Sequence, residues 1–167
     1  MSFEEVRVIT VVYLAVFLPL FIYFTNKSKL PNWIPTFYIV GVVVCALGWE
    51  LWFTYGWVDG HSVDIRRSEV LNTWLPKNLN WLMNSMGDAG AVLLGGVWLM
   101  WLTHRKDATI FKQWRWSAFT ILIFWCISQN ILVEMFLYHD QLADGKPLSW
   151  APMSPLGPYF NPILFEY

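Results

Sequence analysis

Charged side chains are scarce in this sequence. Asp, Glu, Lys and Arg make up 14% of its 167 residues, against about 25% in an ordinary soluble domain. So little charge cannot cover a water-facing surface, which argues against a typical soluble domain. The formal net charge is −1 and no basic patch stands out. Nucleic acid is therefore not an expected partner, because phosphate binding needs clustered Lys and Arg.

Cysteine and the motifs of common enzyme classes are also scarce. Cys45 and Cys126 both lie in apolar runs, so we expect buried thiols rather than a disulfide. The chain has no CxxC pair, no glycine-rich phosphate loop and no Ser-His-Asp order. His61 and His139 lie in or beside the predicted outer segments without the spacing of a metal site. We therefore expect no metal and no other cofactor.

Long apolar runs dominate what remains. Apolar residues make up 56% of the chain, and Trp and Phe occur twelve times each. Crossing a bilayer core takes about 20 apolar residues. The fold class predicted for residues 1–167 is therefore all-α, one integral-membrane domain built as a four-helix transmembrane bundle. Its predicted spans are 6–24, 34–57, 79–102 and 114–138.

The first span could be mistaken for a signal peptide. Its start, "MSFEEVR", is acidic, and no small-residue cleavage site follows it. We therefore expect a retained helix.

Basic residues predict the orientation. The loops after the first and third spans carry an excess of Lys and Arg, whereas the outer loop 58–78 is balanced. The positive-inside rule places the two basic loops in the cytoplasm. Both termini and the 58–78 loop are then expected on the periplasmic or lumenal side.

The segment 139–167 has a different character. It contains five prolines, and interior proline removes a donor and clashes with the preceding turn, so it cannot form one regular helix. Its many aromatic and aliphatic residues indicate that it lies along the outer membrane surface or folds back over the bundle.

Three acids interrupt the predicted spans. Glu50, Asp88 and Glu134 lie about 6 to 14 Å below the outer boundary, at 1.5 Å per helical residue. A charge at mid-membrane costs about 3 kcal/mol on insertion scales. We therefore expect these side chains to face the bundle interior, a partner or water.

Other polar residues share helix faces with the acids. Asn80, Asn84 and Asp88 are spaced four apart, as are Asn130, Glu134 and Tyr138, while Glu50 shares a face with Thr54. Trp49, Trp52 and Trp81 lie nearby. These patterns predict an outward-opening acidic pocket with Trp walls.

Simpler interpretations remain open at these positions. Glu50 and Asp88 could form a hydrogen-bonded clamp between helices. Glu134 could face water at the interface, and Asn80 could be a helix cap. The tryptophans could form an interfacial belt.

The predicted pocket suits proton transfer. Desolvation disfavours a carboxylate, so a buried acid can give a proton to an alkene, and Trp faces stabilise a neighbouring cation. We take Glu50, Asp88 and Glu134 as candidate catalytic residues. The candidate substrate-binding residues are Trp49, Trp52, Trp81, Asn80, Asn84, Asn130 and Tyr138.

Three segments resemble the EXPERA family, the membrane fold of sterol Δ8-Δ7 isomerase. They are "GWELWFTYG", "NSMGDAGAVLLGGVWLMWL" and "SQNILVEMFLYHDQLADGKPL". The resemblance implies a small helical bundle with a Trp-rich cavity for sterol-like ligands. It also implies Glu50 and Asp88 as the acid/base pair, with Trp150 and Asn161 as contributors from the tail. The "WE" pair is similar to one in membrane-bound meroterpenoid cyclases.

The expected function is therefore a proton-transfer isomerase or cyclase that acts on a sterol- or terpenoid-like substrate. The alternative is a non-catalytic accessory subunit of a larger membrane complex that binds lipid, quinone or pigment. A small transporter would need polar residues in the cytoplasmic half, where few occur. Expected partners are membrane lipids, a lipophilic small molecule, and a second copy or another subunit.

Overall fold

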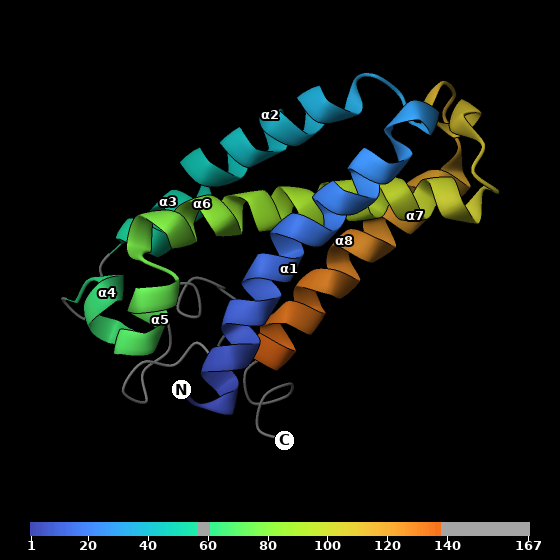
Figure 1. The fold of residues 1–167 in the computed structure, drawn as a ribbon. Coiled ribbons are helices and arrows are strands. Elements are labelled where there is room, and N and C mark those ends of the chain that lie inside the picture. Colours follow the sequence, from blue (N-terminus) through green and yellow to red (C-terminus); the bar gives the residue numbers. More distant parts are fainter. Residues whose placement is uncertain (57–60, 138–167) are drawn as a thin grey trace.

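A computed structural model describes residues 1–56 and 61–137, and their regular elements are all helices (Figure 1). In chain order the elements are α1 (Phe3–Asn26), η1 (Lys27–Lys29), α2 (Ile34–Leu47), α3 (Trp49–Tyr55), α4 (Val63–Arg66), α5 (Glu69–Trp74), α6 (Lys77–Gly87), η2 (Asp88–Leu94), α7 (Gly95–Thr103), η3 (Ala108–Phe111) and α8 (Trp116–Leu137). The all-α prediction is confirmed for this part of the chain.

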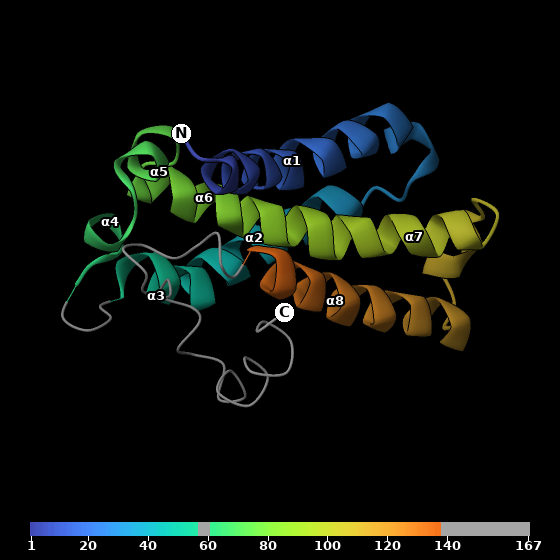
Figure 2. The same ribbon diagram turned by 90° about the horizontal axis from the view of Figure 1, so that it is seen from below.

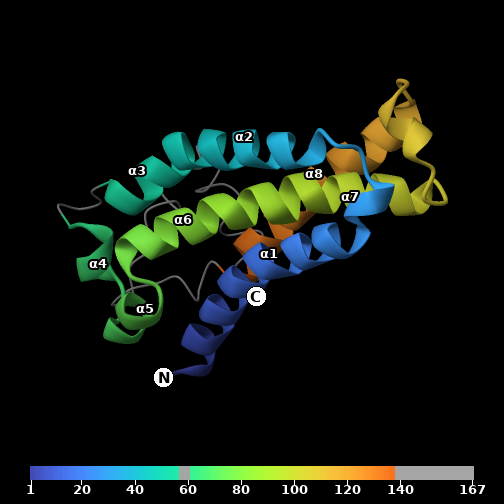
Figure 3. The same ribbon diagram turned by 45° about the horizontal axis from the view of Figure 1, so that its top comes forward.

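The centre of the fold is one long rod formed by α6, η2 and α7. In Figures 1 and 3, α2 lies along one side of this rod and α1 crosses another. Seen from below in Figure 2, the rod lies between α1 and α8. The middle segment η2 contacts α1, α2 and α8, so it is the hub of the packing.

Helix α1 begins at Phe3, three residues earlier than predicted, because Ser2 and Glu5 form a capping box. The Ser2 hydroxyl accepts from the backbone N–H of Glu5 at 3.2 Å, and the Glu5 carboxylate accepts from the N–H of Ser2 at 2.7 Å. Two orphan donors at the helix start are satisfied in this way.

Two of the described helices are long and apolar enough to cross a membrane. They cover Glu5–Lys29 and Lys77–Thr103. A third span results if α2 and α3, which meet at a bend of 40°, count as one. The described part of the last helix, Trp116–Gln129, is shorter. Of the four predicted spans, two or three thus correspond to described helices that could cross a membrane.

The structure adds detail within two predicted segments. The predicted second span, 34–57, is broken at Gly48, and the predicted loop 58–78 contains the short helices α4 and α5. Helix α5 belongs to the core, because Leu71 and Leu75 are buried against Val8 of α1. These apolar residues thus anchor the 58–78 segment to the bundle.

Arg67 stabilises the C-terminal end of α5. The residue is 8% exposed, and its guanidinium donates to the backbone carbonyls of Leu71, at 2.7 Å, and Leu75. The Leu71 carbonyl also accepts from the N–H of Leu75 at 2.8 Å, so the guanidinium adds a second bond at the end of α5. Burial lowers the pKa of Arg67 to about 10, and nearby Asp64 acts in the opposite direction.

The two basic connections lie at the same end of the bundle. The α1–α2 and α7–α8 connections are both at the right in Figure 1, and the Trp33 and Phe111 rings meet edge-to-face at 5.8 Å. This end carries Lys27, Lys29, Arg105, Lys106, Lys112 and Arg115. The connections through α4 and α5 lie at the opposite end.

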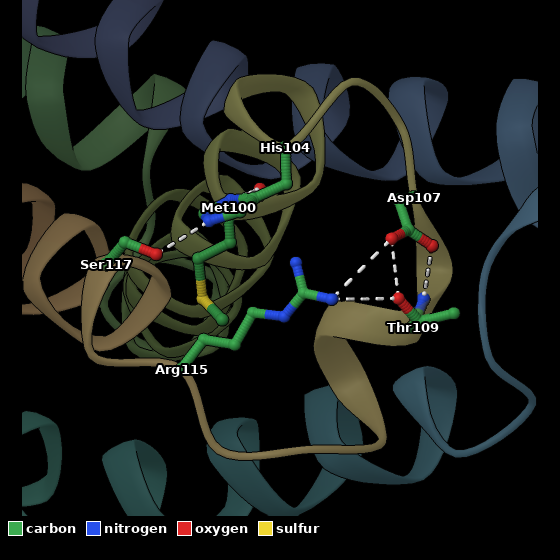
Figure 4. A network of polar contacts seen from close by, with 6 residues as sticks. All are labelled: Met100, His104, Asp107, Thr109, Arg115 and Ser117. Atoms are coloured by element: carbon green, nitrogen blue, oxygen red, sulfur yellow. Dashed lines mark hydrogen bonds and ion pairs between the residues drawn. The ribbon is translucent and has the colours of Figure 1, made fainter.

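A polar network orders the α7–α8 connection (Figure 4). His104 bridges the two helices, with Nδ1 at 2.7 Å from the Met100 carbonyl and Nε2 at 2.9 Å from the Ser117 hydroxyl. A carbonyl only accepts, so Nδ1 carries hydrogen. The Asp107 carboxylate accepts from both the backbone N–H and the hydroxyl of Thr109, and these bonds lower the pKa of Asp107.

Candidate functional site

The candidate site begins at the break between α2 and α3. Helix α2 ends at Leu47, and the N–H of Gly48 still donates to Val44, at 2.9 Å, and Cys45. The chain then bends, and the next helix, α3, begins at Trp49. A side chain at Gly48 would place its Cβ 2.7 Å from the Val44 carbonyl oxygen. Glycine is therefore required for this close approach.

The break leaves a carbonyl without a partner in its own helix. The indole Nε1 of Trp81, on α6, donates to the Ala46 carbonyl at 2.8 Å. The Trp81 ring also meets the Tyr55 ring edge-to-face at 6.2 Å. An unpaired carbonyl in a membrane costs several kcal/mol, so Trp81 stabilises the bend.

Trp49 is the first residue after the break, and it reaches Asp88. Its indole Nε1 donates to Oδ2 of Asp88 at 2.8 Å. Asp88 is the first residue of η2, on the central rod. This bond joins two helix irregularities that are 39 residues apart in sequence.

Glu50 is the most enclosed acid of the described residues. The residue is 2% exposed, and the Asn84 amide lies beside its carboxyl group. Its Oε2 is buried and has no hydrogen-bond partner in the described part of the chain. One turn further, Thr54 is also 2% exposed, and its hydroxyl is likewise buried without a partner there. Buried polar groups are nearly always hydrogen-bonded, so these two neighbouring atoms mark a candidate site. Single atoms of Arg67, Asn72 and Trp101 are also buried without a partner among the described residues.

The π-helical turn η2 determines which way Asp88 and the residues after it face. In an α-helix, residues three and four positions after Asp88 share its face. The i→i+5 bonding of a π-turn moves the matching position to Leu93. Leu93 indeed packs against Gly41 of α2, where any Cβ would collide with it. Ala91 and Gly95 are thereby turned away from the acids and line a cavity with α1 and α8.

Aromatic side chains also bond the carbonyls around this turn. The Tyr38 hydroxyl donates to the Met86 carbonyl at 3.3 Å, and the Trp125 indole donates to the Ala91 carbonyl at 2.8 Å. π-Turns inside α-helices are frequent at functional sites. Here one is held in place by rings from two other helices.

The structure brings Trp49, Glu50, Asn84 and Asp88 together from two helices. Asn80 lies one turn before Asn84 on α6 and is half-buried. It is not a helix cap, because α6 begins at Lys77 with Pro76 as its N-cap. The other predicted site residues lie outside the described side chains: Trp52, Asn130, Glu134 and Tyr138.

The described cavity does not include the acids. It has a volume of about 390 Å³ and lies between α1, the η2–α7 segment and α8, with an almost wholly apolar lining. Residues after Asp88 line it, but Asp88 itself does not. The predicted Trp-walled pocket around the carboxyl groups therefore does not coincide with this cavity.

Within the described residues, no three His, Cys, Asp or Glu side chains are placed to hold a metal ion. His61 is exposed, next to α4.

Sequence reasoning missed the two helix irregularities on which this geometry depends. Gly48, in "ALGWE", was a usable signal, since an isolated glycine in a helical run marks close backbone approach or a helix end. The run "GDAGAVLLGG" gave no sign of a π-turn.

Comparison of the chain with protein-family models, with curated proteins and with solved structures finds no match.

Proposed function

We propose that this is an integral membrane protein in which Glu50 and Asp88 transfer protons to and from a lipophilic substrate, as an isomerase or cyclase. The observation that carries the proposal is the buried Glu50 Oε2, without a partner among the described residues, beside an Asp88 held by Trp49. An intramembrane ionisable residue is by default a functional residue.

The proposed membrane placement follows the helix order. In it α1, the bent α2–α3 pair, the central rod and α8 each cross the bilayer. The end carrying Lys27 and Arg105 faces the cytoplasm, and both termini lie on the other side. The Gly48 break and the acids then lie in the outer half of the bilayer, within reach of a molecule that diffuses in from the lipid.

The proposed roles differ for the two acids. Protonated Glu50 gives its proton from Oε2 to an alkene carbon, which leaves a carbocation. Asp88 takes a proton from the neighbouring carbon, so the double bond moves and no net charge is produced. Asn84 orients Glu50, and Trp49 orients Asp88 while its ring stabilises the cation. The Thr54 hydroxyl, also without a described partner, is placed to bind a polar group of the substrate.

The EXPERA resemblance supports the same class of substrate. By that resemblance the ligand is a sterol- or terpenoid-like molecule, and Glu50 and Asp88 form the acid/base pair. The helix spacing adds Glu134 as a third candidate carboxyl group. Trp150 and Asn161 would contribute from the tail.

A non-catalytic accessory subunit that binds lipid, quinone or pigment is the second candidate. The observation in its favour is the apolar cavity, which lies away from the acids. In that case the Trp49–Asp88 and Glu50–Asn84 pairs act as clamps between helices.

Deuterium incorporation tests proton transfer with a mixture of natural lipids as candidate substrates. The purified protein is incubated in D₂O with a total lipid extract from its host membrane, and lipophiles are analysed by mass spectrometry. An isomerase or cyclase adds one deuterium to a carbon of its product. General acid–base catalysis contributes about 10²- to 10⁴-fold, so Glu50→Gln and Asp88→Asn should each reduce incorporation at least 100-fold.

The matched control is Glu69→Gln, which changes an exposed carboxyl on α5. It should incorporate deuterium at the wild-type rate. Equal incorporation by wild type, Glu50→Gln and a protein-free sample would refute proton transfer and leave the accessory role.

A further inference from the structure

The apolar cavity is a groove with a floor of small residues and walls of large ones. Ala15 and Pro19 of α1 and Ala91 and Gly95 of the central rod form the floor, each pair four residues apart. The walls come from Leu14, Leu18, Trp98, Leu99 and Trp125. Leu14 is 53% and Leu18 51% exposed, so the groove opens outward between α1 and α8.

The groove is long and wide enough for one hydrocarbon chain. From Val11 to Ile22 it follows about 17 Å of α1, at 1.5 Å per residue. Its volume of about 390 Å³ lies within the range of about 300–1,000 Å³ that is usual for small-molecule pockets. One extended hydrocarbon chain can therefore lie along it, and the apolar lining favours such a ligand.

The groove also matches one leaflet in length. The hydrocarbon core of a bilayer is about 30 Å thick, so about 17 Å corresponds to one acyl chain. At mid-membrane Gln129 lines the groove, and its Nε2 donates back to the Cys126 carbonyl at 3.4 Å. The lining is otherwise suited to hydrocarbon alone.

The inner end of the groove is basic. Its last lining residues are Tyr23, Leu30 and Ile34, which flank the short helix η1. Lys27 and Lys29 on η1 are exposed, and the segment 25–33 contains no acid. A chain that enters the groove from the inner leaflet would thus carry its headgroup to two lysines.

We propose that this groove binds one acyl chain of an anionic phospholipid from the inner leaflet, with the phosphate at Lys27 and Lys29. The proposal rests on the membrane placement given above and is independent of proton transfer by Glu50 and Asp88. Each basic residue near a charged surface contributes about 1 kcal/mol of attraction. The two lysines therefore add a preference for an anionic headgroup to the fit of the acyl chain in the groove.

Native mass spectrometry of the detergent-purified protein tests this site. The protein is exchanged into an equimolar mixture of phosphatidylglycerol and phosphatidylcholine with identical linear chains. Wild type should retain one phosphatidylglycerol at collision energies that remove other lipids. Ala91→Leu, which fills the floor of the groove, should reduce this retention at least tenfold. Val43→Leu, on the exposed face of α2, is the control and should retain the lipid.

The headgroup site is tested separately. The double change Lys27→Gln and Lys29→Gln should still retain one lipid but lose the preference for phosphatidylglycerol, whereas Lys112→Gln at the same end should keep it. Phosphatidylglycerol with methyl-branched phytanyl chains should bind wild type at least tenfold less, which tests the groove even if Ala91→Leu fails to fold.

Equal lipid retention by wild type, Ala91→Leu and Val43→Leu, or equal retention of linear and branched chains, would overturn the proposal. So would a second polypeptide that is displaced by Ala91→Leu while lipid stays bound. Carbonate extraction checks the membrane placement on its own. A protein released from membranes by carbonate would refute that placement, whereas loss of deuterium incorporation alone would leave the lipid site standing.

Discussion

Trp49 and Asp88 are hydrogen-bonded across the centre of the fold, with 2.8 Å between the indole Nε1 and the carboxylate Oδ2. Each residue lies at an irregularity of its helix, Trp49 directly after the Gly48 break and Asp88 at the start of the π-turn. The bond therefore couples the bend of one helix to the turn of another.

Trp49→Phe should show the strength of this coupling. The change keeps most of the ring and removes the N–H, and hydrogen bonds to charged groups contribute about 1.5–3 kcal/mol. Trp49 is 45% exposed, so we expect a loss somewhat below this range, about 1 kcal/mol in the free energy of unfolding. Denaturant unfolding in detergent measures it. Trp114→Phe, at a position that is 66% exposed, should have no measurable effect.

Gly48→Ala should destabilise the protein more than Gly41→Ala. A Cβ at Gly48 meets the Val44 carbonyl oxygen at 2.7 Å, and this backbone atom cannot move without disturbing the end of α2. At Gly41 the obstacle is the tip of the Leu93 side chain, which can rotate. We expect about 1–3 kcal/mol for Gly48→Ala, the usual cost of overpacking, and less for Gly41→Ala. Equal melting temperatures for the two variants would contradict this account of the break.

Thr54→Val should raise stability. The Thr54 hydroxyl is buried and has no partner among the described residues, and an unpaired buried polar group costs about 1–3 kcal/mol. Valine has nearly the same shape without that cost. We expect a higher melting temperature together with a loss of deuterium incorporation, the usual exchange of stability for function. Thr120→Val, on an exposed face of α8, is the control. An unchanged melting temperature for Thr54→Val would indicate that the hydroxyl is already satisfied.

Stability should fall in acid partly through Asp64. Its Oδ1 accepts from Lys77 Nζ at 3.0 Å, and this bond lowers the pKa of Asp64. A carboxyl whose pKa is lower in the folded state stabilises the fold above its unfolded pKa, near 3.9, and loses that contribution as pH falls through the folded value. Melting temperatures measured from pH 6 to pH 2 should therefore decline less in Asp64→Asn than in wild type. Glu69→Gln should follow wild type, and parallel curves for all three proteins would exclude this ion pair as a contributor.

Composition and hydrophobic run length were enough to predict an all-helical chain with helices that could cross a membrane. Little charge and long apolar runs leave few alternatives, because an isolated helix satisfies its own backbone in lipid. The apolar runs around Val16 and Val97 form α1 and the central rod, and both of these elements end close to the predicted boundaries. Spacing of four residues placed Asn84 and Asp88 on one face, and the structure finds both beside α3.

The helical class, the apolar spans and the shared helix face of the polar residues follow from the sequence, because run length and periodicity are local properties. How these pieces meet depends on contacts between distant segments. The break at Gly48 and the π-turn at Asp88 are held by Trp81, Tyr38 and Trp125 on other helices. No local pattern encodes those contacts, since each indole or hydroxyl bonds a carbonyl 34 to 48 residues away. For the same reason the groove, lined from three distant segments, could not be read from any one of them.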